Sequence, residues 1–236
     1  MKIVTWNCNG ALRNKFQHLS EFEADIYIIQ ECENPELSRN ENYMQWAGQH
    51  LWQGDNKKKG IGIFVKNNNT IEAIHWGNIY KGHKVKHFLP CLINNKLQLL
   101  AIWTSKNSSP NFGYIGQLWK YLEINKVYFD EIILAGDFNS NSIWDEWDRW
   151  WNHSDVVENL SQLKIYSLYH KFFKEEQGKE SNATFFMHRN ILKPYHIDYI
   201  FGSNKFASNI SNFVIGDRDM WIKHSDHLPL VSEFNI

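Results

Sequence analysis

Short apolar runs of strand length recur along the chain, and stretches with helical spacing lie between them. The runs cover residues 3–6, 26–29, 61–65, 97–103, 132–134, 197–201 and 228–234. Several are almost continuously apolar, which is typical of strands that are buried on both faces. The pattern predicts an α/β protein with many strands and few helices.

Three segments between these runs have the features of helices. Apolar side chains share one face over residues 12–19, through Leu12, Phe16 and Leu19, and again over residues 115–122. Ser154 and the acidic residue after it stand directly before an apolar stretch, so a capped helix is predicted to begin there.

The chain has no obvious internal boundary. Asn-rich segments at 67–69, 94–95 and 107–110 are typical of turns, and strands resume on both sides of them. There is no Pro- or Ser-rich linker, no shift in composition and no tandem repeat. Although 236 residues would suit one large domain or two small ones, we expect residues 1–236 to form a single domain.

Composition excludes several classes of protein. With 43% hydrophobic and 22% charged residues, the chain is not disordered, and no apolar run approaches the roughly 20 residues of a membrane-spanning helix. The N-terminus begins with a predicted strand and has no signal-peptide pattern. Three cysteines without a Cys-x-x-Cys pair favour buried thiols over disulfides or zinc. These features predict a cytoplasmic protein, with a monomer as the default and no obligate protein partner.

Charge is balanced overall but clustered locally. Lys and Arg number 25 against 26 Asp and Glu, which is unlike a protein that coats nucleic acid. Basic residues gather at 57–59, 81–87 and 188–196. A lysine run such as 57–59 is more typical of a solvated face than of a nucleic-acid groove. The segment 188–196 is the stronger candidate for a substrate rim because it leads directly into Asp198.

Polar residues end, interrupt or directly precede the apolar runs at five places, and these carry the candidate chemistry. They are Asn7, Glu31, Asp137 with Asn139, Asp198, and Asp226 with His227. Any one of them alone is explained as a turn former or helix cap. Because strand ends converge in layered α/β folds, the five together would supply oxygen ligands for a cation such as Mg²⁺ and an imidazole for acid–base chemistry.

The ordered set resembles the endonuclease/exonuclease/phosphatase superfamily, which includes DNase I and exonuclease III. Its motifs are Trp6-Asn7-Cys8-Asn9, Gln30-Glu31, Gly136-Asp137-Phe138-Asn139, Ile197-Asp198-Tyr199 and Ser225-Asp226-His227. The resemblance extends from about residue 3 to residue 234. It implies a four-layered α/β sandwich, in which two mixed sheets pack face to face with helices on the outer faces, and a site at one edge where loops from both sheets meet.

The resemblance also implies a metal site. Glu31 matches the family's principal metal-ligating glutamate. Asn7 and Asp226 match positions that bind the metal directly or through water. The cofactor implied is Mg²⁺ or Mn²⁺.

The remaining matched residues are implied to act on the phosphate and the attacking water. Asp137 matches the aspartate that positions or deprotonates the water, and Asn139 matches the carboxamide that steadies this aspartate and the phosphate. His227 matches the histidine that contacts a phosphoryl oxygen or acts as acid or base. Asp198 matches the carboxylate that orients this imidazole.

One position departs from the family pattern. Many relatives carry His or Tyr where this chain has Trp103, and an indole donates one hydrogen bond but does not exchange protons. Tyr114 or Gln117, further along the chain, are candidate replacement donors, although an aromatic residue at a helix start is equally well explained by packing. His188 and Arg189 are further candidate contacts to the phosphate or substrate.

The segment 141–151 contains four tryptophans and follows the Asp137 motif immediately. These rings would suit stacking on flipped or single-stranded bases, and would equally suit a lid over the core. In such a lid Asp145, Glu146 and Asp148 would face solvent. Because these acidic groups weigh against a phosphate-binding surface, we favour mainly structural packing with one or two exposed rings.

Three functions from different classes remain. The leading hypothesis is a Mg²⁺- or Mn²⁺-dependent phosphodiester hydrolase, a nuclease that acts on DNA or RNA as an endonuclease. The alternative within the same fold is a phosphoesterase for a small phosphorylated metabolite or lipid headgroup. The third is a catalytically inactive member that binds nucleic acid or a protein partner.

Overall fold

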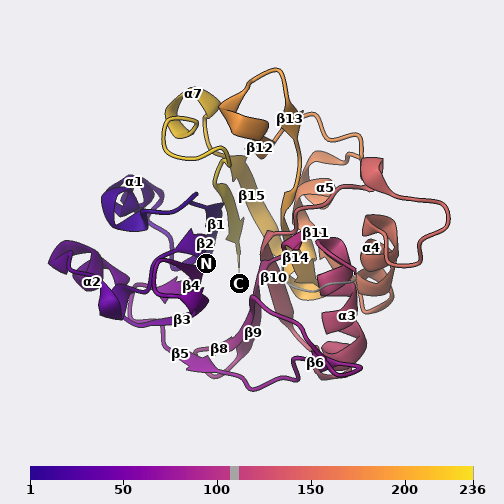
Figure 1. The fold of residues 1–236 in the computed structure, drawn as a ribbon, viewed down its shortest axis with the longest axis horizontal. Coiled ribbons are helices and arrows are strands. Elements are labelled where there is room, and N and C mark those ends of the chain that lie inside the picture. The colour runs from indigo at the N-terminus through magenta and orange to yellow at the C-terminus, as the bar shows by residue number, and fades with distance from the viewer. Residues whose placement is uncertain (107–111, 236) are drawn as a thin grey trace.

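Two six-stranded sheets form the centre of the molecule (Figure 1). The structure is a computed structural model and describes residues 1–106 and 112–235. The turn expected at 107–110 lies outside these residues.

The first sheet has the strand order β15-β16-β1-β2-β4-β3. Its strands are β1 (Lys2–Asn7), β2 (Ile26–Cys32), β3 (His50–Asn56), β4 (Lys59–Val65), β15 (Ile210–Ile215) and β16 (Leu230–Phe234). Strands β1 and β2 are parallel and the other neighbours are antiparallel, so this sheet is mixed.

The second sheet has the order β11-β14-β10-β9-β8-β5. Its strands are β5 (Ile71–Ala73), β8 (Phe88–Ile93), β9 (Leu97–Trp103), β10 (Ile132–Asp137), β11 (Ile165–Ser167) and β14 (Asp198–Ser203). Here β9 and β10 are parallel and the other pairs are antiparallel. Each apolar run that was predicted as a strand lies within or overlaps one of these twelve strands.

Helices and two small hairpins complete the fold. The α-helices are α1 (Phe16–Leu19), α2 (Glu41–Ala47), α3 (Ile115–Asn125), α4 (His153–Gln162), α5 (Leu168–Phe173), α6 (Asn204–Asn209) and α7 (Arg218–Trp221). The 3₁₀ turns are η1 (Leu12–Asn14), η2 (Ser20–Phe22), η3 (Pro35–Leu37), η5 (Lys126–Tyr128), η6 (Ser142–Trp144) and η7 (Met187–Arg189). The hairpins pair β6 (Ile79–Tyr80) with β7 (His83–Lys84), and β12 (Phe185–Phe186) with β13 (Pro194–Tyr195).

Successive side chains of a strand point to opposite faces of its sheet, and this alternation produces four layers. In β1, Ile3 belongs to the core between the sheets, together with Leu99 and Ile133 of the second sheet. The next residue, Val4, points to the opposite face and joins the core beneath α1 and α2. A third core lies between the second sheet and helices α3 and α4. Figure 1 shows α1 and α2 outside one sheet and α3 and α4 outside the other. The predicted α/β sandwich is confirmed.

The first predicted helix is broken in the structure. Its three apolar side chains are buried on one face as expected, but the segment consists of η1, α1 and η2. Lys15 has φ −132°, outside the helical region, and separates η1 from α1. The buried carboxylate of Glu33 accepts hydrogen bonds from the backbone N–H groups of Leu12 and Arg13. A residue distant in sequence therefore satisfies the donors at the start of this segment.

The start of α4 also differs from the prediction. The helix begins at His153, with Asn152 as its N-cap residue, and not at Ser154. Asp145 caps it from outside, because its carboxylate accepts hydrogen bonds from the backbone N–H groups of His153 at 2.8 Å and Ser154 at 3.1 Å. The expectation that Asp145 faces solvent was therefore wrong, whereas Glu146 and Asp148 are exposed.

All three cysteines are buried thiols, as expected. Within residues 1–106 and 112–235, the helices are too short or too polar for any of them to cross a membrane.

The buried His153 predicts a loss of stability in mild acid. Burial lowers the pKa of its imidazole from 6.5 to about 4, although a hydrogen bond to Gln177 opposes this shift. Between these two values the unfolded chain binds a proton that the folded protein does not, so the free energy of unfolding falls as pH falls. We expect a contribution of about 2 kcal/mol to be lost between pH 7 and pH 5. Urea unfolding of the wild type and His153→Gln at both pH values measures it.

The free energy of unfolding of His153→Gln should depend less on pH than that of the wild type. His83 is exposed on β7, so His83→Gln is the matched control and should keep the wild-type dependence. An equal pH dependence in the wild type and His153→Gln would contradict this assignment.

Candidate active site

The polar strand ends of both sheets meet at one edge of the sandwich. Asp137 ends β10 and is paired in register with Asp198, the first residue of β14. Asn7 ends β1 in the other sheet, and its amide Nδ2 donates to Asp137 Oδ2 at 2.9 Å. His227 precedes β16, and its Nε2 lies 4.0 Å from the same carboxylate oxygen. Four side chains from separate motifs therefore lie together.

Hydrogen bonds hold the Asp137 carboxylate in a fixed orientation. Its Oδ2 accepts from the amides of Asn7 and Asn139, both at 2.9 Å, and its Oδ1 accepts from the Asn139 backbone N–H at 2.8 Å. The residue is fully buried. Burial raises the pKa of Asp137 above its usual range, and the nearby charge of His227 opposes the rise. The carboxylate is thus desolvated and oriented, as a base for proton transfer needs to be.

His227 forms a second hydrogen-bonded pair with Asp198. Its Nδ1 contacts the two Asp198 oxygens at 3.1 and 2.9 Å. The Thr184 hydroxyl donates to Asp198 Oδ2 at 2.7 Å and accepts from the Asp198 backbone N–H. Burial alone would lower the pKa of His227, but the negative charges of Asp198 and Asp137 outweigh it and the pKa is raised. The imidazolium form is therefore favoured, with Nε2 directed toward Asp137.

Glu31 lies at the end of β2 in an unusual backbone conformation. Its φ is +62°, and the register of β2 against β4 shifts between Gln30 and Cys32. Such a bulge changes the direction in which a side chain points. The Glu31 carboxylate contacts the ammonium group of Lys59, with Oε2 at 2.8 Å from Nζ. The carboxylate thus already binds a cationic group.

Asn9 connects Asn7 to Asp226. Its backbone N–H donates to Asn7 Oδ1 at 3.0 Å, and its amide donates to Asp226 Oδ1 at 3.0 Å. Ser225 donates its hydroxyl to the Asn7 carbonyl at 2.7 Å. The segments around Asn7 and Asp226, about 220 residues apart in sequence, are therefore held against each other.

Comparison with known proteins identifies this arrangement. A sequence model of the Endonuclease/Exonuclease/phosphatase family matches residues 4–227. The chain belongs to this family. Family membership makes the protein an enzyme that hydrolyses phosphate esters. No curated protein sequence matches the chain significantly.

Solved structures of the Endonuclease/Exonuclease/phosphatase fold are similar throughout. A 3′-5′ exonuclease from Neisseria meningitidis superposes with a TM-score of 0.74 at 18% identity, with 100% of both chains covered. A Neisseria 3′ phosphatase bound to a product DNA hairpin gives 0.75 at 17%, again with complete coverage. An AP endonuclease from Archaeoglobus fulgidus gives 0.70 at 17% over 100% of both chains. At this identity the likeness concerns the fold.

Trp103, the departure from the family pattern, lies at the edge of this site. It is 8% exposed and packs on the imidazole of His87, with ring centroids 4.6 Å apart. Lys59 Nζ lies 5.5 Å from its ring centroid. Trp103, His87 and Glu31 line a cavity of about 430 Å³ that Asn139 also borders. The indole therefore forms an apolar wall beside the candidate metal ligand.

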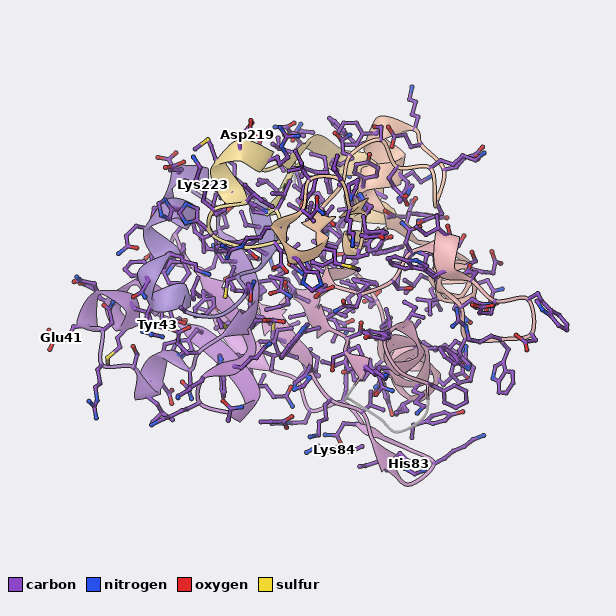
Figure 2. All side chains as sticks on the ribbon, turned by 45° about the horizontal axis from the view of Figure 1, so that its top comes forward. Glu41, Tyr43, His83, Lys84, Asp219 and Lys223 are labelled. Carbon is purple, nitrogen blue, oxygen red and sulfur yellow. The ribbon has the colours of Figure 1, made fainter. Side chains whose placement is uncertain are left out.

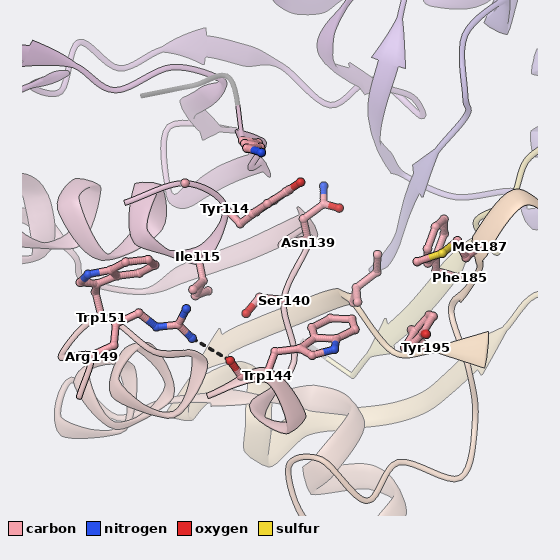
Figure 3. Close-up of a pocket in the computed structure, with 13 residues that line it drawn as sticks. Tyr114, Ile115, Asn139, Ser140, Trp144, Arg149, Trp151, Phe185, Met187 and Tyr195 are labelled. Atoms are coloured by element: carbon pink, nitrogen blue, oxygen red, sulfur yellow. Dashed lines mark hydrogen bonds between the residues drawn. The ribbon is translucent and has the colours of Figure 1, made fainter. Parts of the chain in front are cut away.

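Of the two candidate replacement donors, one reaches the site. Tyr114 is 43% exposed and lines two cavities that both border Asn139. Figure 3 shows its side chain directed toward Asn139. Its φ of +54° and ψ of −123° are rare for a residue with a side chain and cost about 1–3 kcal/mol. Gln117 is buried and donates to the Phe112 carbonyl, so it is not a donor to substrate.

The three basic segments differ in their contacts with the candidate site. Residues 57–59 are exposed, as expected of a solvated face, and Lys59 in addition contacts the candidate metal ligand Glu31. Figure 2 shows His83 and Lys84 at the edge of the molecule on the β6–β7 hairpin, whereas the neighbouring Lys86 pairs with Asp55 at 3.0 Å.

The third basic segment lies on the η7 turn. His188 and Arg189 are exposed there, and Arg189 Nη2 lies 3.5 Å from the His224 carbonyl.

Sequence reasoning missed three residues that support the site. Thr184 braces Asp198, Asn9 joins Asn7 to Asp226, and Lys59 pairs with Glu31. Asn9 was part of a matched motif and its position two residues after Asn7 was a usable signal. Thr184 carries no signal of this kind, because its contact depends on how the β12–β13 hairpin folds over β14.

Proposed function

We propose that the protein is a divalent-metal-dependent phosphodiester hydrolase that cleaves nucleic acid internally. The proposal is carried by three buried side chains, those of Asp198, His227 and Asp137. Nδ1 of His227 is hydrogen-bonded to Asp198, and Nε2 of the same ring lies 4.0 Å from Oδ2 of Asp137. Asn139, which contacts Asp137, borders the two cavities that Tyr114 also lines. A phosphate in this region would contact the His227 imidazolium, while the Asp137 carboxylate would face the attacking water.

Asp137 orients and deprotonates the attacking water in this proposal. Its carboxylate is the fixed base, because Asn7 and Asn139 donate to it and leave it little rotational freedom. Asn139 is half-buried, and its amide nitrogen donates one hydrogen to Asp137 and the other to the Thr104 carbonyl. Its role in this proposal is therefore to hold Asp137 beside the phosphate.

His227 donates a hydrogen bond from Nε2 to a phosphoryl oxygen, where negative charge develops in the transition state. Asp198 fixes the tautomer and the ring orientation through Nδ1, and Thr184 in turn fixes Asp198. Asp198 and Thr184 are thus positioning residues that act through His227.

Glu31, Asn7 and Asp226 fit a hard divalent cation such as Mg²⁺ or Mn²⁺, because all three offer oxygen atoms. The ammonium group of Lys59 on Glu31 supports this assignment, since it occupies the carboxylate as a cation would. Asp137, Asp198 and His227 also have potential ligand atoms within 4.8 Å of one another. The Asp198 oxygens are bound to His227, and an imidazolium does not ligate metal, so that cluster fits proton chemistry better. When bound, the cation neutralises charge on the phosphate and stabilises the leaving oxygen.

Basic residues on both flanks support a polymeric substrate. Lys59 and Lys86 lie on the side of Glu31, where Lys86 pairs with Asp55 of the same cavity. On the side of Asp226, the ammonium group of Lys15 is close enough to Arg189 and Asp226 for their charges to act on it. A strand that continues past the scissile phosphate in both directions would meet cations on each side, which favours internal cleavage.

The described residues are also proposed to form a single domain. The support is the shared core between the sheets and the hydrogen bond that joins Asn7 of one sheet to Asp137 of the other.

Metal dependence is the direct test of this function. Cleavage of plasmid DNA, single-stranded DNA or RNA is expected in Mg²⁺ or Mn²⁺ and should stop in EDTA. Glu31→Gln should raise the Mg²⁺ concentration for half-maximal activity at least as much as the loss of a residue that supports a metal ligand, which is about 10- to 100-fold. Glu36 is an exposed carboxylate of η3 in the following turn, so Glu36→Gln is the matched control and should behave as wild type.

The other outcomes separate the competing functions. Release of inorganic phosphate from small phosphorylated compounds, without strand cleavage, would support the metabolite phosphoesterase. Absence of any metal-dependent hydrolysis, with no rise in melting temperature in Mg²⁺, would support a protein that only binds.

A further inference from the structure

A second cavity, of about 570 Å³, is bordered by Asn139, which contacts Asp137 of the proposed reaction centre; Figure 3 shows the residues that line this cavity. Asn139 and Ser140, which follow Asp137 in the chain, form one side of it. Five of its 13 lining residues are aromatic. The principal rings are those of Tyr114, Trp144, Trp151, Phe185 and Tyr195.

A series of rings extends from the reacting imidazole into this cavity. Phe185 lies against His227, with ring centroids 4.5 Å apart. Tyr195 follows at 6.4 Å from Phe185, and Trp144 follows at 5.2 Å from Tyr195. A group bound against these rings would therefore adjoin a phosphate held by His227, as would the part of the same substrate that lies next to the scissile bond.

One wall of the cavity is formed by Trp144 and Trp151, and neighbouring residues hold the backbone of Trp144 and the ring of Trp151. Arg149 Nη2 donates to the Trp144 carbonyl at 2.7 Å, as Figure 3 shows, and the guanidinium stacks on Trp151 at 4.5 Å. Asn141 caps η6 by accepting from the Ile143 backbone N–H, and its amide donates to the His196 carbonyl. The wall is thus preorganised, and a bound ligand need not order it.

Charge does not oppose a nucleotide here. Asp145, the acidic residue next to Trp144, is used to cap α4. Glu146 and Asp148 are exposed and do not line the cavity. The polar groups that do line it, including Ser140 and the Tyr114 hydroxyl, suit the edges of a base.

We propose that this cavity holds the intact nucleobase of the nucleotide next to the scissile phosphate. A flat base stacks on aromatic side chains, whereas a sugar without a base would leave these rings largely unused. The base has to leave its duplex partner to enter, so the preferred substrate is single-stranded or unpaired nucleic acid. This inference rests on the proposed function, because it defines the substrate of the same reaction centre.

The first test compares cleavage beside a base with cleavage beside none. Single-stranded oligonucleotides that differ by one tetrahydrofuran abasic analogue are digested in Mg²⁺, and the rate at each phosphate is mapped. Cleavage next to the analogue should be about 5- to 100-fold slower than at the same phosphate beside an intact base. Trp144→Ala should remove most of this difference, and Trp144→Phe should restore part of it.

Trp147 provides the matched control. It lies in the same segment, is 95% exposed and does not line the cavity, so Trp147→Ala should keep the wild-type preference. If Trp144→Ala does not fold, Tyr195→Ala tests the neighbouring ring and should act in the same direction. Wild-type cleavage that is equally fast or faster beside the abasic analogue would overturn the proposal. Equal preferences in Trp144→Ala and Trp147→Ala would also overturn it.

The second test needs no hydrolysis and so separates the two proposals. Anisotropy in EDTA measures the affinity for short oligonucleotides of equal length, with intact bases or with abasic analogues throughout, in deoxy and ribo forms. Intact bases should bind at least about 5-fold tighter to the wild type and to Trp147→Ala, but not to Trp144→Ala. Base-dependent binding without cleavage would reject the hydrolase and keep the base pocket. Metal-dependent cleavage without base-dependent binding would keep the hydrolase and reject the base pocket.

Discussion

Replacing Asp137 with asparagine is expected to lower the rate of phosphodiester cleavage about 10²- to 10⁴-fold, the scale for losing a general acid or base. The variant keeps the shape of the side chain but has no carboxylate to accept a proton from water. It also has one acceptor oxygen where Asp137 accepts three hydrogen bonds from Asn7 and Asn139. At least one donor is left without its acceptor, which should cost about 1–3 kcal/mol of stability.

Single-turnover cleavage under saturating Mg²⁺, together with urea unfolding, measures both effects. Asp130 is exposed and precedes β10 at the end opposite Asp137, so Asp130→Asn is the matched control and should retain the wild-type rate. A folded Asp137→Asn variant that cleaves within about threefold of wild type would remove Asp137 from the reaction.

Replacing Asp198 with asparagine should lower the rate on the order of 10³- to 10⁴-fold, although this residue is not expected to touch the substrate. A buried aspartate fixes the tautomer of its histidine, and an amide in its place favours the wrong one. Burial lowers the pKa of His227, and Asp198 supplies the largest of the charge effects that raise it. Without that charge the imidazolium should deprotonate at lower pH.

An NMR titration of the His227 imidazole in the wild type and in Asp198→Asn measures this shift directly. Thr184→Ala is a graded comparison, because it removes the hydrogen bond to Asp198 but leaves both charges, and its effects should be smaller. A purely structural Asp198 would alter stability but not the pKa of His227. An unchanged pKa together with an unchanged rate would therefore refute its positioning role.

The fold could largely be predicted from local patterns. The apolar runs predicted the main strands because the alternation of buried side chains in a strand is a property of the strand itself. The hydrogen bonds that Glu33 accepts at the start of η1 and the cap from Asp145 could not be predicted, because each depends on a partner that chain folding brings close. Glu33 is about 20 residues from Leu12 in the sequence.

The candidate site was likewise predictable only in part. Asn7, Glu31, Asp137, Asp198 and His227 could be selected because polar residues at the ends of apolar strands are conspicuous in the sequence. That Asn7 would donate to Asp137 across two sheets depends on how those sheets pack. The direction of Lys59 toward Glu31 depends on a bulge and a hairpin, and sequence reasoning took this lysine for a solvated one.

The sequence by itself determined the strands, the amphipathic faces of the helices and the choice of candidate reacting groups, because these follow from side-chain chemistry and from short-range periodicity. Only the tertiary structure decided that Trp103 would pack on His87, and that Trp144, Tyr195 and Phe185 would lead from His227 into one cavity. Those contacts join loops far apart in the chain, and their geometry follows from how the layers close against each other.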